Sequence, residues 1–94
     1  MYNVLFTETS AAAIKHLHPD LKKAAKKAVN ELKENPYCGK ELQREFSGYY
    51  SYRFMRYRIV YKPDTQKRNI KIFIVCHKED VYENFSEYLR NTIK

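Results

Sequence analysis

Two short stretches of the chain combine side chains that can hold a phosphate and move a proton. The first is YRFMRYRIVYK, residues 52–62, which places three arginines and a lysine among tyrosines and apolar residues. The second is HKEDVY, residues 77–82, which follows an apolar run. An arginine can hold a phosphate through two hydrogen bonds, and histidine, lysine and tyrosine can exchange protons with a reacting group. Both stretches are therefore candidates for chemistry on an anionic substrate.

The first stretch reads as a hairpin with its charges on one face. In that pairing Arg53 lies directly opposite Arg58, and Tyr49 lies opposite Lys62. Opposed like charges destabilise a hairpin, so one explanation is an anion bound between the two arginines. The other is that both side chains extend into solvent at the hairpin end. Arg56 falls in the turn, where we expect a peripheral contact with a substrate backbone.

Each residue of the second stretch also has a purely structural explanation. His77 could be the partner of a backbone group, Lys78 could be solvated, and Tyr82 could cover the edge of a sheet. The sequence has no metal-ligand spacing and no glycine-rich phosphate loop, so we expect neither a metal nor another cofactor.

The overall charge indicates the kind of partner. Eighteen Lys and Arg against eleven Asp and Glu give a net charge of +7. Between residues 46 and 78 there are eight basic residues and one acid. This excess predicts nucleic acid, an anionic membrane or an acidic protein segment as the partner. No apolar run is long enough to span a bilayer, and Cys38 and Cys76 lie far apart, so we expect a reduced, cytoplasmic protein.

The elements that must position these residues form one domain, residues 1–94. The periodicity predicts the order β-α-α-β-β-β-α, an α+β fold. The expected strands and helices are 2–7, 9–18, 19–35, 49–53, 57–62, 70–78 and 80–94. The segment 37–48 has little periodicity and is expected to be a connector.

Taken in order, three runs resemble the RelE/ParE toxin superfamily of type II toxin–antitoxin pairs: ELKENPYCGKEL, FSGYYSYRFMRYRIVYK and IKIFIVCHKEDVY. The resemblance covers nearly the whole chain. It implies a compact antiparallel sheet with the two N-terminal helices packed on one face and a C-terminal helix.

In the RelE branch the resemblance also implies an activity and partners. Such a toxin is a metal-independent endoribonuclease that cleaves mRNA in the ribosomal A site, beside 16S rRNA, and so inhibits translation. The 2′-hydroxyl attacks the adjacent phosphate and leaves a cyclic phosphate and a 5′-hydroxyl. A cognate antitoxin neutralises the toxin, and no membrane or small-molecule cofactor takes part.

The resemblance further assigns roles to residues. It implies catalytic roles for Arg58, Lys78, Tyr82 and Arg53. His77 matches a position that is histidine in several branches of the family. We expect RNA contacts from His77 and, because of their place on the hairpin, from Tyr49, Lys62 and Arg56. Two positions differ from the family pattern, because Ser51 stands where some members have lysine and Lys78 stands where arginine is usual. A lysine offers a point charge in place of a fork, so we expect slower or differently selective cleavage.

Two other functions stay open at this point. A ParE-like toxin would inhibit DNA gyrase by protein binding, without nuclease chemistry, but such chains usually lack the tyrosine found here at position 82. A basic RNA-binding module without catalysis would use exposed aromatic residues such as Tyr49 to stack on bases.

Overall fold

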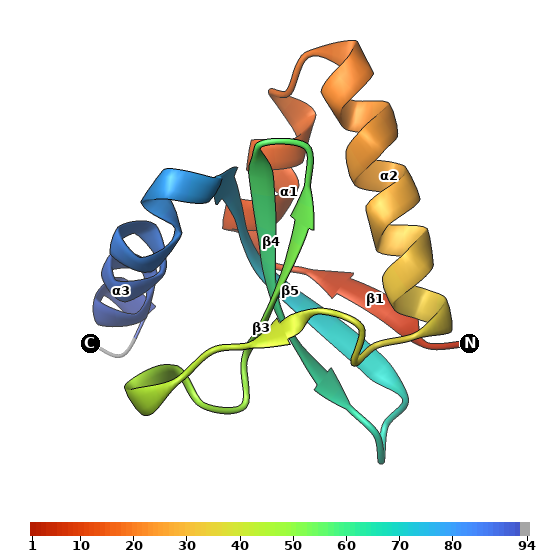
Figure 1. The fold of residues 1–94 in the computed structure, drawn as a ribbon, viewed down its shortest axis with the longest axis vertical. Helices are drawn as coiled ribbons and strands as arrows, with labels where there is room; N and C mark the ends of the chain where they lie inside the picture. Colours follow the sequence, from red (N-terminus) through yellow and green to blue (C-terminus); the bar gives the residue numbers. More distant parts are fainter. Residues whose placement is uncertain (93–94) are drawn as a thin grey trace.

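The computed structural model describes residues 1–92 and shows one sheet covered by helices on both faces (Figure 1). The strands are β1 (Asn3–Phe6), β2 (Lys40–Glu41), β3 (Tyr50–Phe54), β4 (Tyr57–Asp64) and β5 (Asn69–His77). The helices are α1 (Glu8–Lys15), α2 (Pro19–Glu34) and α3 (Val81–Thr92), with short 3-10 turns η1 (Arg44–Phe46) and η2 (Lys78–Asp80). The last two residues of the helix expected at 80–94 lie outside the described residues.

Hydrogen-bond caps and prolines set the bounds of the two N-terminal helices. The hydroxyl of Thr7 accepts a hydrogen bond from the Ser10 amide and caps α1. Pro19 occupies the first turn of α2, where its missing N–H costs nothing. The helix ends before Pro36, because a residue that precedes proline disfavours helical dihedrals. None of the described helices combines the length and the apolar character that a bilayer crossing needs.

The sheet has the order β1-β5-β4-β3-β2. Three neighbouring pairs are antiparallel, but β1 runs parallel to β5. The α+β fold is therefore confirmed, whereas the expectation of an antiparallel sheet needs a correction: the sheet is mixed. The parallel pairing follows from the path of the chain. The helices α1 and α2 form a long connection after β1, so β1 can lie on the outer side of β5 and run in the same direction.

The expected hairpin register is confirmed. Arg53 pairs with Arg58 and Ser51 with Val60 across β3 and β4. The register of β4 against β5 shifts between Val60 and Tyr61. Phe73 is the extra residue that this irregularity adds to β5, and it packs on the α3 side of the sheet together with its neighbour Ile74.

Each face of the sheet has its own core. The core under α1 and α2 includes Leu32, Ile59 and Tyr61, all fully buried. The core under α3 includes Val60 and Phe85. Figure 1 shows α2 and α3 on opposite sides of the sheet, which confirms that the two N-terminal helices share one face. Any surface between α1 and α2 is thus separated from a surface near α3 by the thickness of the sheet.

Candidate functional site

A cleft of about 350 Å³ lies on the α3 side of the sheet, and we call it the Arg58 cleft. Its walls come from β2, β3, β4, η2 and the first turn of α3. The residues that line it are Lys40, Glu41, Leu42, Gln43, Ser51, Arg58, Lys78, Val81 and Tyr82. Three of the four predicted catalytic residues therefore meet in one place, although they come from segments about twenty residues apart.

Arg58 is held in the cleft by its neighbour on β3. Its Nη1 donates a hydrogen bond to the Ser51 hydroxyl at 3.0 Å. Ser51 is only 3% exposed, so its hydroxyl is a fixed acceptor. The bond orients the guanidinium, and the other N–H groups of the fork stay available for an anion.

Lys78 and Tyr82 reach the cleft because the chain turns sharply after β5. The Lys78 amide donates to the Arg56 carbonyl at 2.8 Å, which ties η2 to the β3–β4 turn. Val81 is 4% exposed and anchors the start of α3 in the core. Tyr82, one residue later, is 57% exposed, and its ring centroid lies 6.0 Å from that of Phe46. An exposed ring beside cationic groups is suited to stacking on a base.

The opposite wall is β2, which the sequence did not predict. Gly39 allows β2 to approach β3 closely, because a Cβ at this position would lie 2.6 Å from the Tyr61 hydroxyl and 2.8 Å from the Ser51 carbonyl. Its amide donates to the Tyr61 hydroxyl at 3.1 Å. The Glu41 carboxylate accepts from the Gly48 amide at 3.1 Å and closes the connector against β3.

Arg53 and Arg56 do not line the cleft. Although Arg53 pairs with Arg58 in register, its Nε donates to the Met55 carbonyl at 3.1 Å, so its side chain folds back over the turn. Arg56 is exposed in that turn. The two opposed arginines thus diverge, because Arg58 turns towards Ser51. Their predicted roles stay predictions, and the structure places both at the rim of the hairpin.

The other three predicted contacts also lie outside the cleft. His77 pairs with Tyr57, and its Nδ1 accepts from the Glu79 amide at 3.4 Å, which caps η2. The Tyr49 ring packs on Phe73 and Phe85, with the Lys62 Nζ 5.2 Å from its centroid. Tyr49 and Lys62 share a sheet face with the cleft, and Tyr49 contacts Phe85 of α3, but neither residue lines the cleft.

The cleft has an excess of positive charge. Lys40, Arg58 and Lys78 line it together with one carboxylate, Glu41. Behind the β2 wall, burial raises the pKa of the Tyr61 phenol, so this group is a neutral hydrogen-bonding partner of the connector. Within residues 1–92, no three His, Cys, Asp or Glu side chains are grouped so as to hold a metal ion.

Sequence reasoning missed the residues that β2 and the connector after it contribute to the cleft: Lys40 and Glu41 from the strand, and Leu42 and Gln43 after it. The strand is two residues long, too short for any periodicity to appear. The signal that could have found them is the run GKEL, residues 39–42. Its glycine marks a close approach of two backbones.

The chain is similar to known toxins along most of its length. The family described as the ParE-like toxin of type II bacterial toxin–antitoxin systems matches residues 4–86. Toxin RelG of Mycobacterium tuberculosis is 34% identical over 83 residues, which cover 86% of this chain and 95% of that protein.

Solved structures show the same fold. The toxin–antitoxin complex RelBE2 of M. tuberculosis contains a chain that is 33% identical, with a TM-score of 0.75, and the match covers 81% of this chain and 96% of that one. The isolated RelE toxin of E. coli is 22% identical, with a TM-score of 0.73 and coverage of 95% and 99%. The chain therefore belongs to the ParE-like toxins of type II bacterial toxin–antitoxin systems, within the RelE/ParE superfamily.

Proposed function

We propose that this toxin is an endoribonuclease that cleaves mRNA in the ribosomal A site without a metal ion, and so inhibits translation. The observation that carries the proposal is the composition of the Arg58 cleft. Three cations, a carboxylate and an exposed aromatic ring line one hollow. Such groups can hold a phosphate, transfer protons and stack on a base, which suits cleavage of an RNA backbone by its own 2′-hydroxyl.

The chemistry can be assigned to side chains of the cleft. The 2′-oxygen attacks the adjacent phosphorus while the bond to the 5′-oxygen breaks. The 2′-hydroxyl proton goes to Glu41, whose carboxylate can accept it, and the leaving 5′-oxygen takes a proton from Lys78. Arg58 stabilises the negative charge that builds up on the phosphate oxygens. The products are a 2′,3′-cyclic phosphate and a 5′-hydroxyl.

Binding is divided among the remaining groups. Tyr82, exposed at the mouth of the cleft, stacks on a base next to the cut. Arg53, Arg56, Tyr49, Lys62 and His77 lie outside the cleft and contact the flanking mRNA or 16S rRNA in this proposal. The net charge of +7 favours such contacts with the ribosome.

A cognate antitoxin is the second proposed partner. Structural neighbours include the RelBE2 complex of M. tuberculosis and the RelBE complex of E. coli, which are toxin–antitoxin complexes. A charged segment of such a protein that covered the basic surface of this chain would neutralise the toxin. Because opposite charges would speed the encounter, we expect the association rate to fall as salt is added.

The test is cleavage of a defined mRNA on translating ribosomes, mapped by primer extension. Loss of one charge-stabilising donor typically lowers the rate by about 10² to 10³, so Arg58→Ala should reduce cutting by this amount. Arg90→Ala is the matched control, because it removes an exposed arginine of α3 that does not line the cleft and has no proposed RNA contact, and it should change the rate little. If Arg58→Ala cut at the wild-type rate, the Arg58 cleft would not be the site.

Inhibition of DNA gyrase is the competing function, because the matching family is described as ParE-like. The two are separated by inducing the toxin in cells. Cleaved mRNA and an immediate stop of translation support the nuclease. DNA damage with translation initially intact would support gyrase inhibition and would overturn the proposal.

A further inference from the structure

A second hollow of about 390 Å³ adjoins the Arg58 cleft, and we call it the connector hollow. The end of the connector and the start of α3 supply its lining: Gln43, Arg44, Glu45, Phe46, Tyr82 and Ser86. Gln43 and Tyr82 line both hollows. An RNA strand with a phosphate at Arg58 can therefore place a neighbouring base in the connector hollow.

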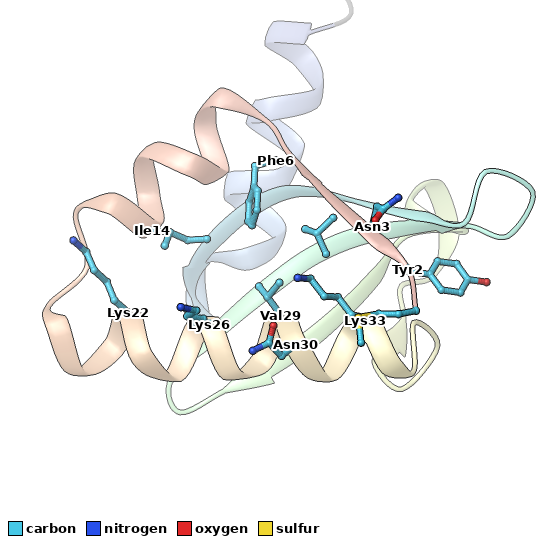
Figure 2. Close-up of a pocket in the computed structure, with 12 residues that line it drawn as sticks. Tyr2, Asn3, Phe6, Ile14, Lys22, Lys26, Val29, Asn30 and Lys33 are labelled. Carbon is cyan, nitrogen blue, oxygen red and sulfur yellow. The ribbon is translucent and has the colours of Figure 1, made fainter.

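The hollow between β1 and α2 has no such connection to the cleft. It measures about 610 Å³ and lies on the other face of the sheet, among residues such as Phe6, Lys26 and Val29 (Figure 2). Among the described residues, none lines both this hollow and the Arg58 cleft. The thickness of the sheet would separate a base held there from a phosphate at Arg58, so we examine the connector hollow as the base site.

An aromatic stack forms one side of the connector hollow. The ring centroids of Tyr82 and Phe46 lie 6.0 Å apart with their planes inclined by 35°, and Phe46 lies 5.3 Å from Phe85. Phe46 is 7% exposed, whereas Tyr82 is 57% exposed. The Tyr82 ring thus rests on buried neighbours and presents a free surface on which a base can stack.

Two side chains of opposite charge, Arg44 and Glu45, line the hollow beside this stack. Both are exposed. Within the described residues, 1–92, neither side chain forms an ion pair or a hydrogen bond, although the two are neighbours in the chain. The guanidinium therefore keeps its donors, and the carboxylate its acceptors, for a ligand.

The backbone of η1 holds these two residues in an unusual conformation. Arg44 has a φ of 59°, in the left-handed region that residues other than glycine rarely adopt. Ser47 maintains this conformation, because its amide and its hydroxyl donate to the Arg44 carbonyl at 3.0 and 2.8 Å. Backbone strain of this kind concentrates at functional sites.

We propose that the connector hollow binds a guanine base of the RNA next to the phosphate at Arg58, and that Arg44 and Glu45 determine this specificity. The inference rests on the nuclease function proposed above. The base stacks on Tyr82, its O6 and N7 accept from the Arg44 guanidinium, and its N1–H and N2–H groups donate to the Glu45 carboxylate. Of the four RNA bases, guanine alone offers both a pair of adjacent acceptors and a pair of adjacent donors.

The same two side chains disfavour adenine. Adenine carries an amine where guanine has O6, so a donor would face the Arg44 guanidinium. Its N1 is an acceptor without a proton, so it would face the acceptor oxygens of Glu45. Both encounters are repulsive, and they separate the two purines, which stack equally well.

The first experiment measures the base preference of cleavage on programmed ribosomes. The mRNAs differ in a single base at each position of the A-site codon, and kcat/KM is determined for each. In the wild type, guanine at one position should raise kcat/KM about tenfold over adenine, because a bidentate contact discriminates by at least this factor. Arg44→Lys removes the fork and Glu45→Gln replaces an acceptor by a donor, so each should lower this ratio to about twofold or less.

Two matched variants control for charge and backbone conformation. Arg68→Lys makes the same change at an exposed arginine that also has a positive φ, 53°, and Glu83→Gln removes the same charge from α3 beside Tyr82. Neither residue lines the connector hollow, so both variants should keep the wild-type ratio. Absence of a guanine preference in the wild type, its persistence in Arg44→Lys or Glu45→Gln, or an equal loss in the controls would overturn the proposal.

A binding measurement separates this proposal from the nuclease function. Guanosine 5′-monophosphate is added to the isotope-labelled full chain without ribosomes, and amide shifts are followed by NMR, with adenosine 5′-monophosphate as the control probe. The guanine nucleotide should shift the Phe46 and Ser86 amides saturably and bind about tenfold more tightly than the adenine nucleotide. In Glu45→Gln the two affinities should become similar.

The outcomes of the two experiments distinguish the two failures. Equal affinities of the wild type for the two nucleotides, or unshifted Phe46 and Ser86 amides, would overturn the guanine site even in a protein that cuts mRNA. A protein that cuts no mRNA but binds the guanine nucleotide selectively in this hollow would refute the nuclease function and support the guanine site.

Discussion

Gly39→Ala tests whether the close approach of β2 to β3 builds the cleft. Gly39 does not have a positive φ, so alanine would meet no conformational strain there. Its Cβ would, however, lie 2.6 Å from the Tyr61 hydroxyl and 2.8 Å from the Ser51 carbonyl. Tyr61 is fully buried and Ser51 belongs to a paired strand, so neither can move away easily.

The cost can be worked out from these contacts. Overpacking typically costs about 1–3 kcal/mol, and loss of the hydrogen bond from the Gly39 amide to Tyr61 adds about 1 kcal/mol. For a domain of this size, about 2–4 kcal/mol lowers the melting temperature by roughly 8–30 °C. We expect this shift in thermal unfolding followed by circular dichroism, with less mRNA cleavage because Glu41 moves with β2.

Gly48→Ala is the matched control. Gly48 has a φ of 94°, but the atom nearest to an added Cβ is the Lys62 Cε at 3.9 Å. Alanine there meets strain of about 1–2 kcal/mol without a clash, so its melting temperature should fall less than that of Gly39→Ala. A Gly39→Ala protein that melts within about 2 °C of the wild type would refute the steric reasoning.

Three further predictions concern single side chains. Ser51→Ala removes the acceptor that orients Arg58. A hydrogen bond to a charged group contributes about 1.5–3 kcal/mol, so kcat for mRNA cleavage should fall by about 10- to 100-fold. An unchanged kcat would show that Ser51 does not position the guanidinium. Lys78→Arg keeps the positive charge but replaces the proposed proton donor by a group that does not release its proton, so mRNA cleavage should fall by about 10²-fold in the same assay. Cleavage at or above the wild-type rate would show that Lys78 holds the phosphate and does not donate the proton. The hydrogen bond from Tyr52 to Glu31 raises the pKa of the phenol from 10.0 to about 12. The folded state therefore favours the neutral phenol. The contribution of this group to the free energy of unfolding is complete below pH 10 and is lost as the pH rises towards 12. Denaturant titrations should therefore show a shallower fall in the free energy of unfolding over this range for Tyr52→Phe than for the wild type.

Much of the fold could be predicted because it depends on local patterns. The apolar stripe and terminal prolines of α2 act within a few residues, and so does the alternation of β3 and β4 that sets Arg53 opposite Arg58. The parallel partner of β1 could not be predicted in this way. Strand pairing across about 66 positions depends on how the whole sheet assembles.

For the site, the sequence alone determined the residue types: a basic hairpin, a junction with lysine and tyrosine, and an excess of positive charge. Tertiary structure decided which of them meet. It placed Arg58, Lys78 and Tyr82 in one cleft, turned Arg53 and His77 towards backbone groups, and added Glu41 from a two-residue strand. The physical reason is that side-chain direction within one face depends on the hydrogen-bond partners and packing supplied by distant segments, and no local spacing encodes them.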